Sequence, residues 1–318
     1  MAFTKRSLGR NGPIVSAIGL GCMSMSEFYG HSDRGTSLRT IAAALEAGVT
    51  LFDTGDFYGV GHNELLLAEA LQGKRDKAFI QVKYGALRSP DGSFIGIDAR
   101  PAAAKNALSY SLQRLGTDHV DLYMTGRDPN VPIEDTIGAM GELVRQGYIR
   151  YLGLTNVDTE TIKRAHAVHP ITALQLEYGL ISRDIEHSVL PLCRELGIGV
   201  TAYGVLSRGL LTGSKGNGSG DVRSTYYPRF HKENLSRNEV LAVALARVAS
   251  SEGITAAQAA ISWVLSQGED IIPLVGARTE ERLREALTSP VQLSADALSA
   301  IEAAVPQDAV HGERFMVR

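Results

Sequence analysis

The feature that most constrains the fold of this 318-residue chain is a repeated alternation of short apolar segments with longer amphipathic ones. Residues 50–53, Thr-Leu-Phe-Asp, form one such apolar segment, and the stretch before them carries Leu38, Ile41 and Leu45 at helical spacing. Gly48 follows that stretch and suits the end of a helix. We expect about eight strands of this kind, most of them followed by a helix, at residues 17–20, 50–53, 79–83, 120–123, 151–154, 173–176, 199–202 and 271–274.

The order of these segments predicts a closed barrel. Strands joined by helical crossovers pair in parallel, and plausible crossover helices lie at 101–115, 133–146, 160–167 and 188–196. About eight strand–helix units in a chain of this length fit a (β/α)8 TIM barrel better than an open doubly wound sheet. No Gly-x-Gly-x-x-Gly opens a helix after a strand, so the fingerprint of the open dinucleotide-binding sheet is missing. We therefore predict one barrel domain over residues 1–318.

Two stretches stand outside the repeat. Residues 3–8 and 13–18 predict an N-terminal β-hairpin at the bottom of the barrel, turning at Gly9-Arg10-Asn11-Gly12. Residues 204–235 predict a flexible loop whose glycine-rich part is 213–221. A loop of that length in a compact domain is usually functional or disordered.

Composition excludes several classes of function. A net charge of −3 gives no reason to expect nucleic acid or an acidic membrane as a partner. No apolar run approaches the roughly 20 residues of a spanning helix, and the N-terminus lacks the apolar run of a secretory signal. Cys22 and Cys193 are far apart and outside any metal-binding spacing, so we expect reduced thiols, with a disulfide as the alternative, no metal and a cytoplasmic protein. The sequence leaves the oligomeric state undetermined.

Three polar residues follow the predicted ends of neighbouring strands, where barrel active sites lie. Asp53 ends one strand, Tyr58 lies five residues later in the loop, and Lys83 ends the next strand. An ammonium beside a phenol stabilises the phenolate and lowers the phenol pKa, which suits proton donation to a carbonyl that receives a hydride. The alternative is a structural ion pair between Asp53 and Lys83, with Tyr58 as a loop aromatic.

Several segments, taken in order along nearly the whole chain, resemble the signatures of the aldo-keto reductases. The segments are Gly19-Leu20-Gly21-Cys22-Met23, Asp53-Thr54-Gly55-Asp56-Phe57-Tyr58-Gly59, Gly61-His62-Asn63-Glu64, Gly153-Leu154-Thr155-Asn156, Gln175-Leu176-Glu177-Tyr178 and Ala202-Tyr203-Gly204-Val205-Leu206-Ser207-Arg208-Gly209. The resemblance implies a barrel that binds extended NADPH without the open-sheet motif. It also implies that Tyr58 is the general acid, that Lys83 lowers its pKa, and that Asp53 pairs with Lys83.

The same resemblance implies a set of residues that bind NADPH or NADP+. Thr155, Asn156 and Gln175 match positions that bond the nicotinamide carboxamide, and Tyr203 matches the aromatic that stacks on its ring. Arg278 or Arg282 would contact the 2′-phosphate, for which the arginine fork is suited, and Glu285 the adenine. The loop 213–221 would fold over the pyrophosphate, or is a bare linker. The remaining expected cofactor residues are Gly21, Cys22, Met23, Asp53, Gly204, Leu206, Arg208, Gly209 and Gly276.

The chain departs from the family pattern after the fourth barrel strand. The family usually has a histidine in a segment like Leu-Tyr-x-x-His, where this chain has Gly126. Three interpretations follow: the protein reduces bulkier or already activated carbonyls, Thr125 or Arg127 replaces the histidine, or NADPH is bound with little turnover. We expect Phe57, Gly126 and Arg127 to contact a small-molecule carbonyl or alcohol substrate. An NADPH-dependent carbonyl reductase is thus predicted, with an NADPH-binding sensor or auxiliary protein as the alternative.

Overall fold

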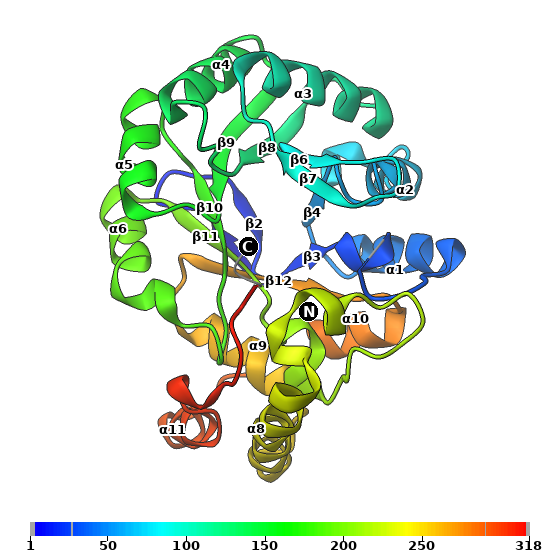
Figure 1. Cartoon of the computed structure of the whole chain (residues 1–318), viewed down its shortest axis with the longest axis vertical. Coiled ribbons are helices and arrows are strands. Elements are labelled where there is room, and N and C mark those ends of the chain that lie inside the picture. Colours follow the sequence, from blue (N-terminus) through cyan, green and yellow to red (C-terminus); the bar gives the residue numbers. More distant parts are fainter. Residues whose placement is uncertain (1–3, 27, 290, 316–318) are drawn as a thin grey trace.

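A closed barrel of parallel strands forms the centre of the molecule in the computed structural model, which describes residues 4–26, 28–289 and 291–315 (Figure 1). The strands follow one another around the barrel in chain order, and the last pairs with the first. The (β/α)8 prediction is confirmed. The barrel strands are β3 (Gly19–Gly21), β4 (Leu51–Gly55), β5 (Phe79–Tyr84), β8 (Val120–Thr125), β9 (Ile149–Thr155), β10 (Ala173–Glu177), β11 (Gly199–Tyr203) and β12 (Ile271–Gly276).

Helices surround the barrel and connect its strands (Figure 1). The helix predicted at 101–115 begins and ends as expected, because Pro101 suits a first helical turn and Gly116 adopts the left-handed conformation that ends a helix. The helices are α1 (Arg34–Glu46), α2 (His62–Ala70), α3 (Pro101–Leu115), α4 (Ile133–Arg145), α5 (Thr159–Val168), α6 (Val189–Leu196), α7 (Arg223–Tyr226), α8 (Lys232–Ser251), α9 (Ala256–Ser266), α10 (Glu280–Leu287) and α11 (Ala295–Ala304).

The predicted hairpin closes the bottom of the barrel. Its strands are β1 (Lys5–Ser7) and β2 (Ile14–Ser16), and the predicted start at residue 3 lies outside the described residues. Gly9 has φ +84°, and a Cβ there would lie 2.7 Å from the carbonyl oxygen of Gly197, just before β11. Only glycine permits this close approach of two main chains.

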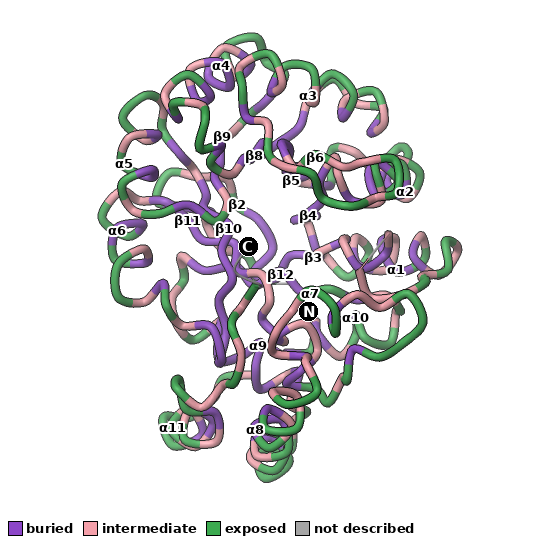
Figure 2. Tube along the Cα trace, viewed as in Figure 1, coloured by how far each residue is buried: buried purple, intermediate pink, exposed green. Residues whose placement is uncertain are grey.

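Two apolar layers hold the barrel together. The inner layer combines side chains of the barrel strands with Leu8 and Val15 of the hairpin, so the barrel is a packed core rather than a pore. The outer layer lies between strands and helices, and Figure 2 shows burial concentrated on the strands and on the helix faces turned toward them. The inner layer consists of Leu8, Val15, Leu51, Leu122, Met124, Ala173, Ile272 and Leu274.

A second hairpin, which we did not predict, follows β5. Its strands are β6 (Ala86–Arg88) and β7 (Phe94–Ile97), and it joins at Ser89–Ser93. The turn contains Pro90-Asp91-Gly92, residues that favour a tight turn, so the sequence did carry a signal for it. The hairpin extends the connection between β5 and α3 at the carboxyl end of the barrel strands.

The expected long loop at 204–235 contains short helices. These are η4 (Ser207–Thr212), α7 and η5 (Pro228–Phe230), and α8 begins at Lys232. The segment is attached to the loop after β3, because the amide of Val222 donates to the carbonyl of Phe28 (3.1 Å) and Tyr29 bridges to Asp221. We call residues 213–222 the belt. The belt passes from the β11 side of the barrel mouth to the β3 side.

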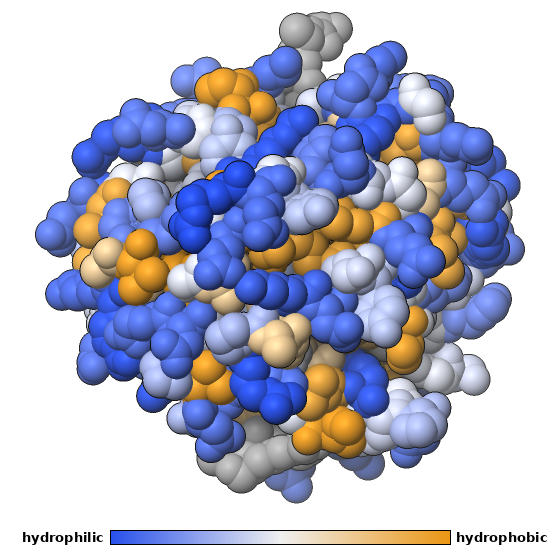
Figure 3. Space-filling view, turned by 90° about the horizontal axis from the view of Figure 1, so that it is seen from above, coloured by the Kyte–Doolittle hydropathy of each residue, from blue (hydrophilic) through white to orange (hydrophobic). Residues whose placement is uncertain are grey.

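The surface is mainly polar, with apolar residues in separate groups on the face seen in Figure 3. Among the described residues, no single helix is both long and apolar enough to cross a membrane. Helices α8 and α9 meet that test only when taken together, and they bend by 85° at their junction.

Candidate active site

Asp53 is the centre of a buried polar cluster at the mouth of the barrel. Its Oδ1 accepts hydrogen bonds from Lys83 Nζ (2.6 Å), Gln81 Nε2 (2.7 Å) and Gln175 Nε2 (2.7 Å). These donors come from β5 and from β10, which lies across the barrel from β4 in the strand order. Asp53 is therefore fixed by neighbouring and opposite strands at once.

Lys83 lies between Asp53 and the ring of Tyr58. Its ammonium donates to Asp53 and to the carbonyl of Thr54 (2.9 Å), and Nζ is 4.8 Å from the centre of the Tyr58 ring. Burial lowers the pKa of Lys83, and the Asp53 carboxylate opposes that shift. The three side chains predicted to converge do lie together. Their catalytic roles stay a prediction.

A short turn after β4 presents Tyr58. The amide of Tyr58 donates to the carbonyl of Gly55 (3.0 Å), and the Tyr58 side chain is largely buried. Phe57 packs edge-on against it, with ring centres 4.9 Å apart, and Arg88 of the second hairpin stacks on Phe57 at 5.7 Å. The predicted substrate residue Phe57 thus lies beside Tyr58 at the rim of the mouth.

The β8 side of the mouth is open where the family histidine would stand. A Cβ added to Gly126 would meet only the carbonyl oxygen of Thr155 within 4 Å, at 3.4 Å. The hydroxyl of Thr125 is buried and donates to the carbonyl of Gly126 (3.2 Å). Arg127 is half exposed and lies 4.0 Å from Asp158. In the contacts that the structure describes, the Thr125 hydroxyl bonds to main chain and Arg127 lies near Asp158. Neither contact places a polar group where the imidazole of the family histidine would lie.

The residues expected to hold the nicotinamide surround the β9–β11 side of the mouth. Tyr203 ends β11, and its hydroxyl donates to Asn156 Oδ1 (2.9 Å). Asn156 has φ +52° and also contacts Thr155 through its side chain. Gln175 is buried and its amide nitrogen is engaged by Asp53, so a contact with a carboxamide would use its side-chain oxygen.

Glycines form the floor between β3 and β12. Gly21 and Gly276 are paired neighbours in the barrel, and a Cβ on either would have only contacts of 3.6 Å or longer. The side chain of Cys22 is buried, and burial raises its pKa, so this residue can meet a ligand only through its main chain. Met23 begins η1 (Met23–Met25) at the same rim. Gly21 is half-buried and Gly276 is exposed, so main chain is accessible to a ligand at this rim.

Arg208 is fixed beside Tyr203. Its guanidinium pairs with the fully buried Glu177 (2.7 Å) and lies over the rings of Tyr227 at 4.3 Å and Tyr203 at 5.9 Å. A Cβ on Gly204, which has φ +70°, would lie 2.9 Å from Glu177 Cγ. The other expected residues of this segment, Leu206 and Gly209, flank Arg208 before and within η4.

The residues expected at the 2′-phosphate lie at the start of α10. Thr279 caps this helix through its side chain. Arg278 donates to the carbonyl of Tyr29 (2.8 Å), whereas Arg282 is largely exposed and pairs with Glu285 (2.9 Å). Arg282 is therefore the arginine with more freedom to meet an anion.

The structure adds residues that we did not predict from the sequence. Gln81 is one of the three donors to Asp53, and its position two residues before Lys83 on one strand was the available signal. Asp56, Glu64 and Arg114 form a second charged group behind Tyr58, with Arg114 Nε 2.5 Å from Glu64 Oε2. Arg114 is 50 residues from Glu64 in sequence, and no local pattern predicts that contact.

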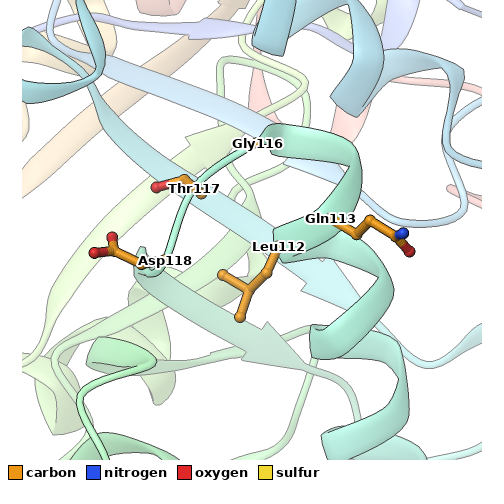
Figure 4. Close-up of a pocket in the computed structure, with 5 residues that line it drawn as sticks. All are labelled: Leu112, Gln113, Gly116, Thr117 and Asp118. Atoms are coloured by element: carbon orange, nitrogen blue, oxygen red, sulfur yellow. The ribbon is translucent and has the colours of Figure 1, made fainter.

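Other features of the described residues offer no competing site. No group of three or more His, Cys, Asp or Glu side chains there is arranged to hold a metal ion. A surface hollow between the end of α3 and the start of β8 is lined by Leu112, Gln113, Gly116, Thr117 and Asp118 (Figure 4). It lies at the amino end of β8, away from Lys83 at the carboxyl end of β5, and Gln113 and Asp118 point away from each other.

Comparisons with known proteins agree with this geometry. The model of the aldo/keto reductase family matches residues 17–306. A probable aldo-keto reductase 1 from Glycine max is 39% identical over 315 residues, which cover 97% of this chain and 90% of that protein. The glycerol dehydrogenase AKR11B4 from Gluconobacter oxydans superposes with a TM-score of 0.86 at 28% identity, over 100% of both chains.

A further solved structure carries a ligand. The aldo/keto reductase from Klebsiella pneumoniae, in complex with NADP and acetate, has a TM-score of 0.77 at 25% identity and covers 99% of this chain and 100% of its own. The family uses nicotinamide cofactors. On this evidence the chain belongs to the aldo/keto reductase family of oxidoreductases.

Proposed function

We propose that this chain is an NADPH-dependent oxidoreductase that reduces an aldehyde or ketone to an alcohol, and that it also runs in reverse. The observation that carries the proposal is the position of Lys83, whose Nζ is 2.6 Å from Asp53 and 4.8 Å from the ring of Tyr58. A cation so close to a phenol favours the ionised form of the phenol. The arrangement suits proton transfer at the end of β4, where barrel active sites lie.

Each of the three residues has a separate role in the proposal. Tyr58 holds the proton on its hydroxyl and gives it to the carbonyl oxygen as negative charge develops there. Lys83 stabilises the phenolate that remains. Asp53 keeps the ammonium charged and oriented, and the amides of Gln81 and Gln175 fix Asp53 in turn.

The residues around the mouth fit a nicotinamide dinucleotide. The accessible main chain at Gly21 and Gly276 offers room for an extended ligand, the belt is attached to the loop after β3, and Tyr203 offers a ring for stacking. When bound, the dinucleotide supplies the hydride. Thr155, Asn156 and Gln175 would hold its carboxamide.

A preference for NADPH over NADH rests on the start of α10. Arg282 is exposed in the first turn of α10, and Arg278 lies just before that helix, so either arginine can offer paired N–H donors to a phosphate. The N-terminus of the helix adds favourable charge for an anion. Glu285 is held near Arg282 and would meet the adenine.

The open space at Gly126 favours a bulky carbonyl substrate. A histidine at this position would narrow the mouth beside the path of the hydride, and here only the carbonyl oxygen of Thr155 bounds the gap within 4 Å. Phe57, which follows β4 beside Tyr58, supplies an apolar wall. Arg127 stands at the rim, where it would attract an anionic group on a substrate.

Replacing Tyr58 with phenylalanine tests the proposed function. We expect Tyr58→Phe to lower kcat for a panel of aldehydes and ketones by about 100-fold or more, because the general acid is lost. Its affinity for NADPH, measured by fluorescence titration beside NADH, should change little. Tyr110→Phe, at an exposed position on α3, is the matched control.

The alternative function predicts a different result. An NADPH-binding sensor or auxiliary protein would bind the cofactor and turn over no carbonyl above the level of Tyr58→Phe. Gly126 is the feature that favours this alternative. Equal affinity for NADPH and NADH would contradict the phosphate contacts at α10.

A further inference from the structure

A second carboxyl group, that of Asp56, lies behind Lys83 without taking part in the Asp53 ion pair. Asp56 follows β4 directly, and its amide donates to the carbonyl of Lys83 itself (2.9 Å). Its Oδ1 is buried and has no hydrogen-bond partner among the described residues. A buried carboxylate oxygen without a donor is costly, so the position requires an explanation.

The charged neighbours of Asp56 are already engaged elsewhere. The guanidinium of Arg114 pairs with Glu64, whose side chain is fully buried, and Lys83 pairs with Asp53. Glu64 adds a like charge that disfavours the ionised form of Asp56. The net charge of the five groups, three carboxylates against two cations, would be −1 if all were ionised.

Two buried tyrosines lie nearby and add no charge, and the main chain of Phe57 also contacts the Asp56 carboxyl. Tyr84 and Tyr123 stack with ring centres 4.5 Å apart, and burial raises the pKa of both hydroxyls. Burial, and then the charge of Glu64, raise the pKa of Asp56 to about 7. We therefore expect the carboxyl of Asp56 to exchange its proton near neutral pH.

We propose that Asp56 is a positioning residue that acts through Lys83: when Asp56 loses its proton, the new negative charge holds the ammonium more firmly and makes Tyr58 a weaker acid. The inference rests on the proposed function, because it assigns regulation to the same site. A negative charge near a cation–phenol pair opposes ionisation of the phenol. Asp56 therefore adjusts the balance between reduction, which needs the phenol, and oxidation, which needs the phenolate.

The pH dependence of turnover tests this coupling. In reduction, Asp56→Asn should move the alkaline limb of kcat/KM to lower pH by about half a unit to one unit, because the variant never acquires the negative charge. In oxidation, the acid limb should move down by a similar amount. Asp118→Asn, an exposed acid at the other end of the barrel, should leave both limbs in place.

A second measurement needs no turnover. Ultraviolet difference titration of the wild type against Tyr58→Phe isolates the ionisation of Tyr58, and the same pair in an Asp56→Asn background should show a lower midpoint. Asp56→Ser provides a second neutral variant if the asparagine variant folds poorly. Unchanged midpoints in both backgrounds would overturn the proposal, even where turnover confirms a reductase. A shifted midpoint in a protein that turns over no carbonyl would support the coupling of Asp56 to Tyr58 and contradict the proposed function.

Discussion

The two ends of the barrel hold their buried carboxylates in different ways. At the bottom, Asp121 accepts from Arg75 (2.7 Å), from Arg150 (3.0 Å) and from the amide of Ile80 (2.8 Å). At the mouth, Asp53 accepts from one lysine and two side-chain amides. Arginine stays charged at any working pH, whereas a buried lysine readily changes its pKa.

The difference separates a structural ion-pair cluster at the bottom from the proposed reaction centre at the mouth. The Asp121 cluster joins η2 (Arg75–Lys77), β5, β8 and β9 through two arginines, whose charge is permanent, and a main-chain donor, and His119 Nε2 lies 4.0 Å from Asp121. The Asp53 cluster contains a buried lysine, a cation that can exchange a proton, placed against a phenol. Barrels of this type place stability at the amino ends of the strands and chemistry at the carboxyl ends.

Removing both charges at the mouth should separate chemistry from stability most clearly. We expect the double variant Asp53→Asn, Lys83→Met to lose about 100-fold or more in kcat, because the cation beside Tyr58 is gone. Its melting temperature should change by only a few degrees, since a neutralised buried pair leaves no uncompensated charge. Steady-state kinetics and thermal unfolding by circular dichroism measure the two effects. A large loss of stability with activity retained would show that the pair at the mouth stabilises the fold and does not take part in the reaction.

The matching change at the bottom should act on stability alone. Asp121→Asn leaves Arg75 and Arg150 without their shared anion, and we expect a loss of about 2 kcal/mol in the free energy of unfolding. Activity per folded molecule should equal that of the wild type. Urea denaturation supplies the first quantity and active-site-normalised kinetics the second. A fall in kcat without a fall in stability would show that the Asp121 cluster affects turnover at the mouth.

The sequence predicted which residues lie at the mouth better than it predicted the hydrogen bonds between them. Asp53 and Lys83 could be placed together because each ends a predicted strand, and adjacent parallel strands bring their ends to one rim, although β4 continues to Gly55 and β5 to Tyr84. The bond from Gln175 to Asp53 crosses the barrel, and it depends on closure of the sheet rather than on any local pattern. Asp56 gave no signal of its own, because its importance comes from what surrounds it.

The loop at 204–235 also shows that a local sequence pattern does not predict contacts between distant residues. Its glycines indicated flexibility, and they do allow the left-handed turns that the main chain makes there. The helical turns and the attachment to the loop after β3 come from contacts with residues nearly 200 positions earlier, such as Val222 with Phe28. Local propensity cannot report contacts of that kind.

Asp56 sharpens the comparison because its effect on stability should depend on pH. Its pKa in the folded state is about 7, above the ordinary value of 3.8, so the folded protein holds the proton more tightly than the unfolded chain. Wild-type stability should therefore fall as pH rises from about 4 to about 7 and level off above that. Asp56→Asn removes this cost, and it should gain on the order of 2 kcal/mol relative to wild type between pH 5 and pH 8.

Urea unfolding at several pH values checks this expectation. Glu134→Gln serves as the comparison, because its carboxylate is paired with Arg164, which stays charged over the same range. Its difference from wild type should stay nearly constant between pH 5 and pH 8. A gain for Asp56→Asn that is the same at every pH would mean that the carboxyl is ionised throughout.

Filling the gap at Gly126 should give the smallest effect and tests the open side of the mouth. The main chain there is not in the left-handed region, and an added Cβ meets the carbonyl oxygen of Thr155 at 3.4 Å, so a side chain can be accommodated by a shift of a few tenths of an ångström. Gly126→His should raise kcat/KM for small aldehydes several-fold, about 1 kcal/mol, by helping to orient the carbonyl, and lower it for bulky ketones. Gly126→Ala separates the loss of space from the gain of an imidazole, because it fills part of the gap without a hydrogen-bond donor. If the histidine and alanine variants share one substrate profile, the gap acts only through its size and the imidazole does not orient the carbonyl. If neither variant differs from wild type, the substrate approaches Tyr58 from the Phe57 side.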